Sequence, residues 1–149
     1  MTKLNLSENF ISQIWENKSY YSDLMTTNDE HVSVIDYGSK NTDAGPDYKN
    51  ARVNINGKVY TGSIEIHRSV KDWHLHNHRN DKKYSDLILH VVLYGNENEE
   101  LFSNPVVRKS RHVPTVILSN HLTKSLHEIW KQSICPDAWR IGAEAGHFG

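Results

Sequence analysis

The sequence has one cysteine, few prolines and no long apolar run. The single cysteine, Cys135, excludes an internal disulfide framework and a cysteine-based zinc finger. No apolar stretch approaches the ~20 residues that a membrane-spanning helix needs, and residues 1–9 are too polar for a signal peptide. The net charge of −1 excludes coating of nucleic acid or of an anionic membrane through bulk charge. These absences predict a cytoplasmic protein without a membrane partner, and they leave the oligomeric state open.

The length and composition fit one ordinary globular domain. The chain has 149 residues, of which 37% are hydrophobic and 23% are charged. We therefore expect a single domain over residues 1–149, either complete or the N-terminal part of a longer protein. Charge is uneven, because residues 48–83 hold eight basic and three acidic side chains. This segment fits contact with an anionic ligand such as DNA or RNA, and it equally fits a solvated face with paired charges.

Helices are expected at both ends of the chain. Ser7 is a suitable cap for a first helix, and Ser119 or Asn120 for a last helix. Each predicted helix has an apolar stripe at helical spacing. The stripes are Phe10, Ile11, Ile14 and Trp15 in the first helix, and Leu122, Leu126, Ile129 and Trp130 in the last.

The middle of the chain predicts a mixed β-sheet. Asn56-Gly57 is a strong two-residue turn signal and predicts a β-hairpin over residues 48–67. Residues 87–94 are almost continuously apolar, as expected of a central strand that is covered on both faces. Shorter strands are expected at 31–37 and 113–118. The predicted fold is therefore α/β or α+β, with helices flanking a mixed central sheet that contains a β-hairpin.

The first candidate site lies on the hairpin. Asp47 stands at its start, and Glu65 and His67 share one face of its second strand. Two carboxylates suit Mg²⁺ or Mn²⁺, which would leave room for a phosphate and a water. We expect Asp47 and Glu65 to bind the metal, and Asp47, Glu65 and His67 to be the catalytic residues. The alternative is that Asp47 caps a turn while Glu65 forms an ordinary salt bridge.

The register of the hairpin decides whether this site can form. A strict two-residue turn pairs Val53 with Tyr60 and, by extension, Asp47 with Ile66. That pairing puts Asp47 on the face opposite Glu65. A three-residue loop with a bulge, or a place for Asp47 in the loop ahead of the strand, would return it to the same face.

A histidine cluster is the second candidate site. It lies in the polar segment 69–86, which is expected to be helical in part. Two or three imidazoles with a carboxylate suit Zn²⁺ or another transition metal, and the predicted ligands are His76, His78 and Asp81. The alternative is a polar surface segment. Four further motif residues are Asp72, Trp73, Tyr84 and His90, of which His90 reads as a hydrogen-bonded core histidine or as part of a site beneath the sheet.

The hairpin motif resembles that of the PD-(D/E)XK nuclease superfamily. That superfamily has an Asp on one hairpin strand and Glu-x-Lys on the next, and His67 stands here in place of the Lys. The resemblance implies a nuclease-like core and an extra helix-borne acid, for which Glu8 and Glu16 are both candidates. It also implies phosphate contacts from nearby basic side chains. These are Arg68, Lys71, Arg79, Lys82 and Lys83.

Longer strings resemble a bacterial family known as domain of unknown function 2851. They cover residues 41–51, 62–67, 72–84 and 87–92. The family has no established activity, so the resemblance implies one structural unit and leaves the reaction open. Three hypotheses stand: a Mg²⁺- or Mn²⁺-dependent phosphodiesterase acting on DNA or RNA, a transition-metal-binding domain, and a scaffold or interaction domain without chemistry. We favour the first.

Overall fold

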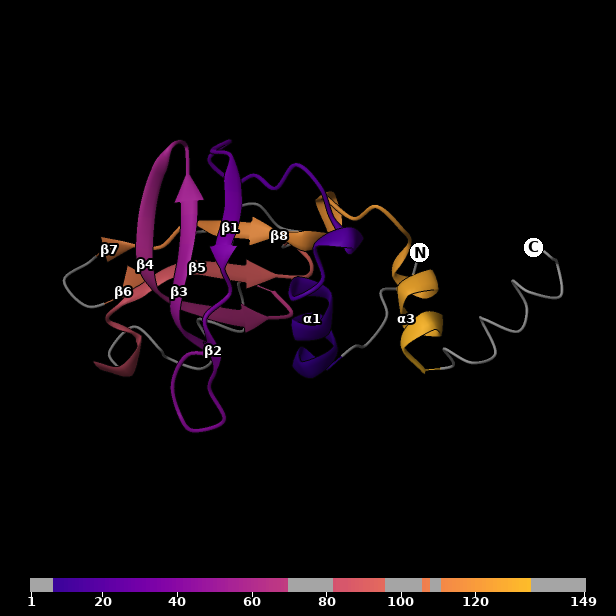
Figure 1. The fold of residues 1–149 in the computed structure, drawn as a ribbon, viewed down its shortest axis with the longest axis horizontal. Coiled ribbons are helices and arrows are strands. Elements are labelled where there is room, and N and C mark those ends of the chain that lie inside the picture. Colours follow the sequence, from indigo (N-terminus) through magenta and orange to yellow (C-terminus); the bar gives the residue numbers. More distant parts are fainter. Residues whose placement is uncertain (1–6, 70–81, 96–105, 108–110, 135–149) are drawn as a thin grey trace, which may run out of the picture.

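The chain folds as an α+β unit around one curled, mixed sheet. The computed structural model describes residues 7–69, 82–95, 106–107 and 111–134 (Figure 1). Within these ranges two α-helices accompany the sheet, α1 (Glu8–Trp15) and α3 (Leu126–Ile134). No helix within the described ranges is long and apolar enough to cross a membrane. The predicted α+β class and the mixed central sheet are confirmed.

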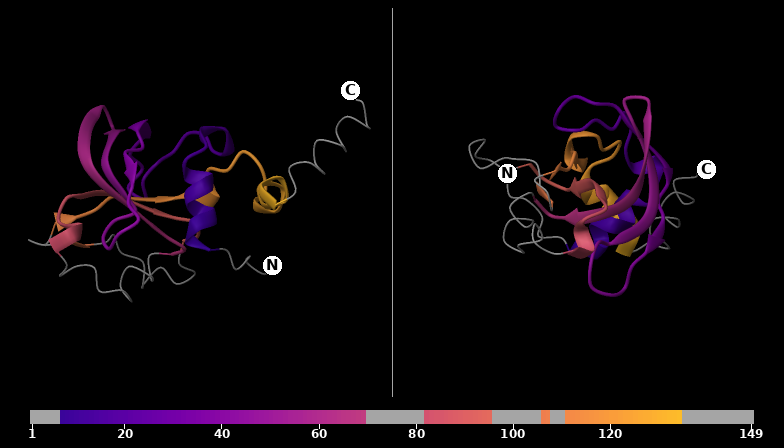
Figure 2. Two further views of the ribbon diagram at one scale, coloured as in Figure 1. Left: turned by 60° about the horizontal axis from the view of Figure 1, so that its bottom comes forward. Right: turned by 90° about the vertical axis from the view of Figure 1, so that its left-hand side faces the viewer.

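The sheet has six strands and is shaped like half a barrel. Its main path runs β1-β3-β4-β5-β8, and the short β2 adds to β3. The pairs on the β3 side of β4 are antiparallel, whereas β4–β5 and β5–β8 are parallel. Figure 2 shows the strong curvature, with both helices toward one end of the sheet. The bounds are β1 (Val32–Asp36), β2 (Ser39–Lys40), β3 (Tyr48–Ile55), β4 (Lys58–His67), β5 (Leu87–Val92) and β8 (Thr115–Ile117), and a separate ribbon joins β6 (Val106–Val107) to β7 (Arg111–His112).

β4 changes its surroundings halfway along its length. Its first four residues are exposed in the hairpin arm, and every residue from Gly62 to His67 is buried. Gly62 lies so close to the next segment that a β-carbon there would meet the carbonyl oxygen of Asp86 at 2.3 Å. Ser63 fixes this contact, because its amide donates to the same oxygen at 3.0 Å. The absent side chain thus lets β4 turn from the hairpin into the parallel part of the sheet.

The core lies between α1 and one face of the sheet. Ser7 caps α1 as predicted, accepting a hydrogen bond from the amide of Phe10 at 3.2 Å. Side chains on this face of β4 and β5, such as Ile66 and Val91, are fully buried in the same cluster as those of α1. Trp15 at the end of α1 stacks on Tyr21 with ring centroids 5.6 Å apart. The core face is therefore apolar and continuous.

The start of the last helix was predicted too early. Residues 118–120 form a 3₁₀ turn, and α3 begins at Leu126. Ser125, rather than Ser119 or Asn120, accepts a hydrogen bond from the amide of Glu128 at 3.1 Å. The Ser-x-x-Glu spacing is that of a capping box, which satisfies the free amides of the first turn. Leu122 therefore lies outside the helix. Trp130, which was predicted as part of the apolar stripe, is 39% exposed.

Candidate active site

One extra residue in β3 decides where Asp47 lies. The turn at Asn56-Gly57 is the strict two-residue turn, because Ile55 pairs with Lys58. Between the pairs Tyr48–Ile64 and Ala51–Gly62, however, β3 advances three residues while β4 advances two. Asn50 in this bulge has a φ of +59°, a left-handed conformation that asparagine tolerates better than most residues. Extension of this register pairs Asp47 with Glu65, and paired residues project from the same face of the sheet. The bulge that the sequence requires is therefore present inside the strand.

Gly38 packs against the bulge from outside. Its φ is +82°, and a β-carbon there would lie 2.3 Å from the carbonyl oxygen of Lys49 and 2.8 Å from the amide nitrogen of Ala51. The amide of Gly38 donates to a carboxylate oxygen of Asp36 at 2.8 Å, which holds this turn. The connection between β1 and β2 therefore supports the bulge that aligns Asp47 with Glu65.

Asp47 and Glu65 form a close pair of carboxyl groups. The amide of Asp47 donates to Oε1 of Glu65 at 3.2 Å, and the amide of Ile66 donates to Oδ2 of Asp47 at 2.7 Å. Glu65 is 4% exposed, whereas Asp47 is half-buried. Burial, a side-chain hydrogen bond to Asp47 and the charges of Asp47 and Glu8 raise the pKa of Glu65 to about 10. Near neutral pH the metal-free pair therefore favours a shared proton.

His67 connects this pair to a second histidine. Its Nε2 lies 3.4 Å from Oε2 of Glu65, and its Nδ1 lies 2.8 Å from Nε2 of His90. The two rings stand nearly perpendicular, at an interplanar angle of 77°. His90 is fully buried and hydrogen-bonded, as expected of a core histidine. His90 also contacts the candidate site through His67. The sequence offered this place for His90 only as the second of two alternatives.

The site belongs to a polar face of the sheet. Glu65 on β4 pairs with His90 on β5, and His90 pairs with Thr115 on β8. All three side chains are buried, and Thr115 Oγ1 has no hydrogen-bond partner among the described residues. The opposite face carries the apolar core. We call Ser63, Glu65, His67, His90 and Thr115 the polar face.

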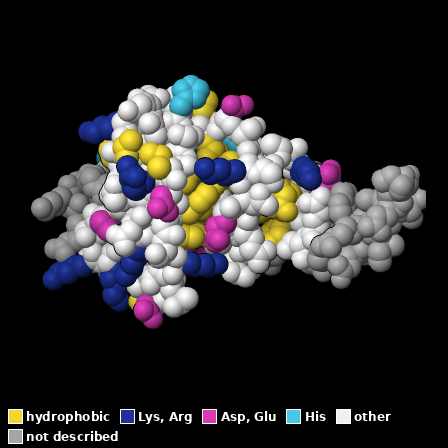
Figure 3. All heavy atoms as spheres, viewed as in Figure 1, with side chains coloured by type: hydrophobic (Ala, Val, Ile, Leu, Met, Phe, Trp, Pro, Cys, Tyr) yellow, Lys and Arg dark blue, Asp and Glu magenta, His cyan; other side chains and the backbone are white. Residues whose placement is uncertain are grey.

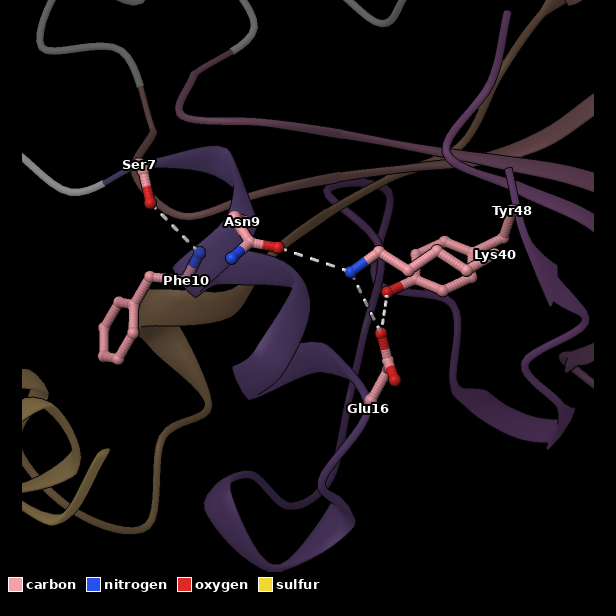
Figure 4. A network of polar contacts seen from close by, with 6 residues as sticks. All are labelled: Ser7, Asn9, Phe10, Glu16, Lys40 and Tyr48. Atoms are coloured by element: carbon pink, nitrogen blue, oxygen red, sulfur yellow. Dashed lines mark hydrogen bonds and ion pairs between the residues drawn. The ribbon is translucent and has the colours of Figure 1, made fainter. Parts of the chain in front are cut away.

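A network at the end of α1 fixes the start of β3 (Figure 4). Tyr48 donates from its hydroxyl to Oε2 of Glu16 at 2.5 Å. Lys40 Nζ lies 3.9 Å from the same oxygen and donates to Asn9 at 3.4 Å. Glu16 thus anchors the residue next to Asp47 rather than joining the carboxyl pair. Of the two helix-borne acids, Glu8 is the one whose charge acts on Glu65.

Three of the basic side chains predicted to contact phosphates lie in the described ranges. Arg68, Lys82 and Lys83 are exposed. Lys83 lies against the loop of Asp47, since a β-carbon on Gly45 would contact Lys83 Cβ at 3.4 Å. On the side shown in Figure 3, basic and acidic side chains are interspersed rather than gathered into one patch. This side of the molecule therefore presents no single basic patch.

Several predicted residues lie outside the described ranges. These are Lys71, Asp72, Trp73, His76, His78, Arg79 and Asp81. Tyr84 is buried in a small apolar cluster with Leu87 and Val113, which is the packing role that a tyrosine most often has. Within the described part of the chain, no group of three or more His, Cys, Asp or Glu side chains is arranged to hold a metal ion.

Comparison with known sequences gives the class of the protein. The family described as protein of unknown function DUF2851 matches residues 8–141, so the chain belongs to this family. The predicted resemblance to that family is confirmed. No curated protein and no solved structure matches the chain.

Proposed function

We propose that this chain is a Mg²⁺- or Mn²⁺-dependent phosphodiesterase that acts on nucleic acid, with a nuclease-like site at Asp47, Glu65 and His67. The observation that carries the proposal is the bulge at Asn50. It turns Asp47 to the face of Glu65 in a hairpin whose turn alone would separate them. A bulge at a strained position beside polar side chains is typical of a functional site.

The residues fit a hard divalent cation. Mg²⁺ is commonly held by one or two carboxylates, with waters and substrate phosphates completing its shell. Asp47 and Glu65 offer two carboxylates, with Glu8 near enough to act on Glu65 through its charge. A cation would offset the burial and the charges of Asp47 and Glu8 that raise the pKa of Glu65. Asp47, the partly exposed member, marks the side from which metal and substrate would enter.

The chain's own residues would then take two further roles. When bound, the metal supplies Lewis-acid polarisation of a phosphate and a more acidic water. His67, one strand alternation beyond Glu65, would orient the water or stabilise negative charge on the phosphate. Lys83, beside the loop of Asp47, and the exposed Arg68 and Lys82 would bind flanking phosphates. The succession of helix, hairpin and parallel strand is the one expected for a nuclease-like core, which supports this assignment.

The proposal is tested by calorimetric titration with Mn²⁺, Mg²⁺ and Zn²⁺, followed by cleavage assays on DNA and RNA oligonucleotides. Asp47→Asn removes one ligand charge, and Asp43→Asn changes an exposed acid of the same loop as the matched control. We expect Asp47→Asn to weaken Mn²⁺ binding by at least about tenfold and to abolish cleavage, while Asp43→Asn leaves both unchanged.

Two results would contradict the proposal. One is a folded wild-type chain that binds neither Mg²⁺ nor Mn²⁺, which would favour a scaffold. The other is tight Zn²⁺ binding that survives Asp47→Asn but is lost in His76→Ala, which would move the chemistry to the histidine cluster.

A further inference from the structure

His67 needs a neighbour to fix its ring, because an imidazole offers two different nitrogens where a lysine offers one ammonium. We infer that His90 is a positioning residue that holds the His67 ring in a single tautomer and directs its Nε2 toward Glu65. The catalytic meaning of this inference rests on the proposed function. Whether His90 positions the His67 ring can be tested without measuring any activity.

The geometry of the pair supports this role. His67 Nδ1 and His90 Nε2 are 2.8 Å apart, so one nitrogen donates and the other accepts. The remaining nitrogen of His67, Nε2, lies 3.4 Å from Glu65 Oε2. Since the bond at one imidazole nitrogen determines whether the other carries the proton, the placement of the proton between His67 and His90 determines what His67 presents to Glu65.

The backbone around His90 makes it a rigid support. β5 pairs with β4 on one side and β8 on the other, and the amide of His90 donates to the carbonyl of Pro114 at 2.9 Å. The side chain itself is fully buried. Thr115, its cross-strand neighbour, is also buried and leaves its Oγ1 without a partner among the described residues. The backbone of His90 is therefore held from both sides while its side chain reaches His67 through Nε2.

A packing role makes a different prediction from a positioning role. His90→Met fills much of the same volume with a flexible apolar chain, and so satisfies packing but removes the polar atom. His90→Gln carries an amide that reaches about as far as Nε2 and can either donate or accept. If His90 only fills space, the two variants behave alike. If it positions His67, only the glutamine variant preserves the state of the ring.

The test uses the metal-free chain with ¹⁵N-labelled histidine and reads the tautomer of His67 from long-range ¹H–¹⁵N correlation spectra. We expect one tautomer in the wild type and in His90→Gln, and averaging between two in His90→Met. In cleavage assays we expect kcat to fall at least about tenfold in His90→Met with KM little changed, and to recover in His90→Gln.

The inference is overturned if His67 keeps the same single tautomer in His90→Met. It also has a test that needs no variant, a scalar coupling between His67 Nδ1 and His90 Nε2 across the hydrogen bond in the wild type. Presence of the coupling supports the pair, and its absence overturns it. A wild type that shows the coupling and a single tautomer but cleaves nothing would refute the proposed function while leaving the positioning role standing.

Discussion

Asp47 and Glu65 each bind the other's strand. Asp47 accepts from the amide of Ile66 on β4, and Glu65 accepts from the amide of Asp47 at the start of β3. The two carboxyl groups therefore close the end of the hairpin as well as forming the candidate site. A change at either residue affects local structure and chemistry together, so tests of the site need variants that separate the two.

Asn50→Val makes that separation. A β-branched residue disfavours the φ of +59° that the bulge needs, and a regular ladder of unchanged length pairs Asp47 with Ile66, on the face opposite Glu65. We expect a folded chain, by circular dichroism, with weaker Mn²⁺ binding in a calorimetric titration. Asn50→Gly is the control, because glycine adopts the same positive φ and keeps the bulge. Wild-type Mn²⁺ affinity in Asn50→Val would show that the bulge at Asn50 is irrelevant to metal binding.

Glu65 gives the metal-free protein a characteristic pH dependence. Its pKa is raised from 4.5 to about 10 in the folded chain, so the folded state holds a proton that the unfolded state releases. The stability that this proton confers is complete below pH 4.5 and is lost as the pH rises toward about 10.

Glu65→Gln has no such proton to lose. We expect the free energy of unfolding of the wild type, relative to Glu65→Gln, to fall with pH by up to about 1.4 kcal/mol per pH unit in this window. Urea denaturation with a chelator present at pH 5, 7 and 9 measures the difference. Parallel pH profiles of the two proteins would contradict the raised pKa.

Tyr48 should stabilise the fold through its bond to Glu16. The hydroxyl donates to a carboxylate at 2.5 Å, and the ring is almost fully buried. Tyr48→Phe should lower the free energy of unfolding by about 1.5–3 kcal/mol, the range for hydrogen bonds to charged groups. Tyr20→Phe is the matched control, since its hydroxyl makes only a 3.5 Å contact with Gln132, and we expect a smaller loss. Equal losses in chemical denaturation would argue against a special role for the Tyr48–Glu16 bond.

Lys83 should contribute to binding of an oligonucleotide. It lies against the loop of Asp47, whereas Lys58 lies at the far end of the hairpin over Tyr60. We expect Lys83→Ala to weaken binding of a labelled oligonucleotide in fluorescence anisotropy and to reduce the salt dependence by about one phosphate contact. Lys58→Ala should change neither quantity. Equal effects of the two changes would indicate nonspecific attraction.

The sequence predicted the parts of the fold that depend on local chemistry. Asn56-Gly57 specifies its turn directly, and strand alternation placed Glu65 and His67 on one face. The sequence showed that Asp47 can share a face with Glu65 only through a bulge or a loop position, but it did not locate the bulge. No local pattern distinguishes Asn50 from an ordinary strand residue. The Ser-x-x-Glu spacing of Ser125 and Glu128 is also a local signal, and it marks the start of the last helix more closely than Ser119 or Asn120 does.

The partnership of His67 with His90 could not be predicted in this way. The two residues are 23 positions apart, and they meet only because β4 and β5 are parallel in one particular register. Nothing local in either strand specifies that register. An apolar run around His90 indicates burial, and burial alone does not say which neighbour a side chain has.

β4 pairs with β3 and with β5, and the two pairings differ in the length of the connecting segment. The hairpin with β3 needs only a two-residue connection, whereas the parallel pairing with β5 requires a longer crossover and forms more slowly. We therefore expect the folding chain to bring Asp47 beside Glu65 first, in water and with both groups ionised. The docking of β5 then dehydrates the pair and supplies the imidazole of His90. If the pair binds a cation as proposed, Mn²⁺ should speed the docking of β5, which refolding kinetics with and without Mn²⁺ would measure.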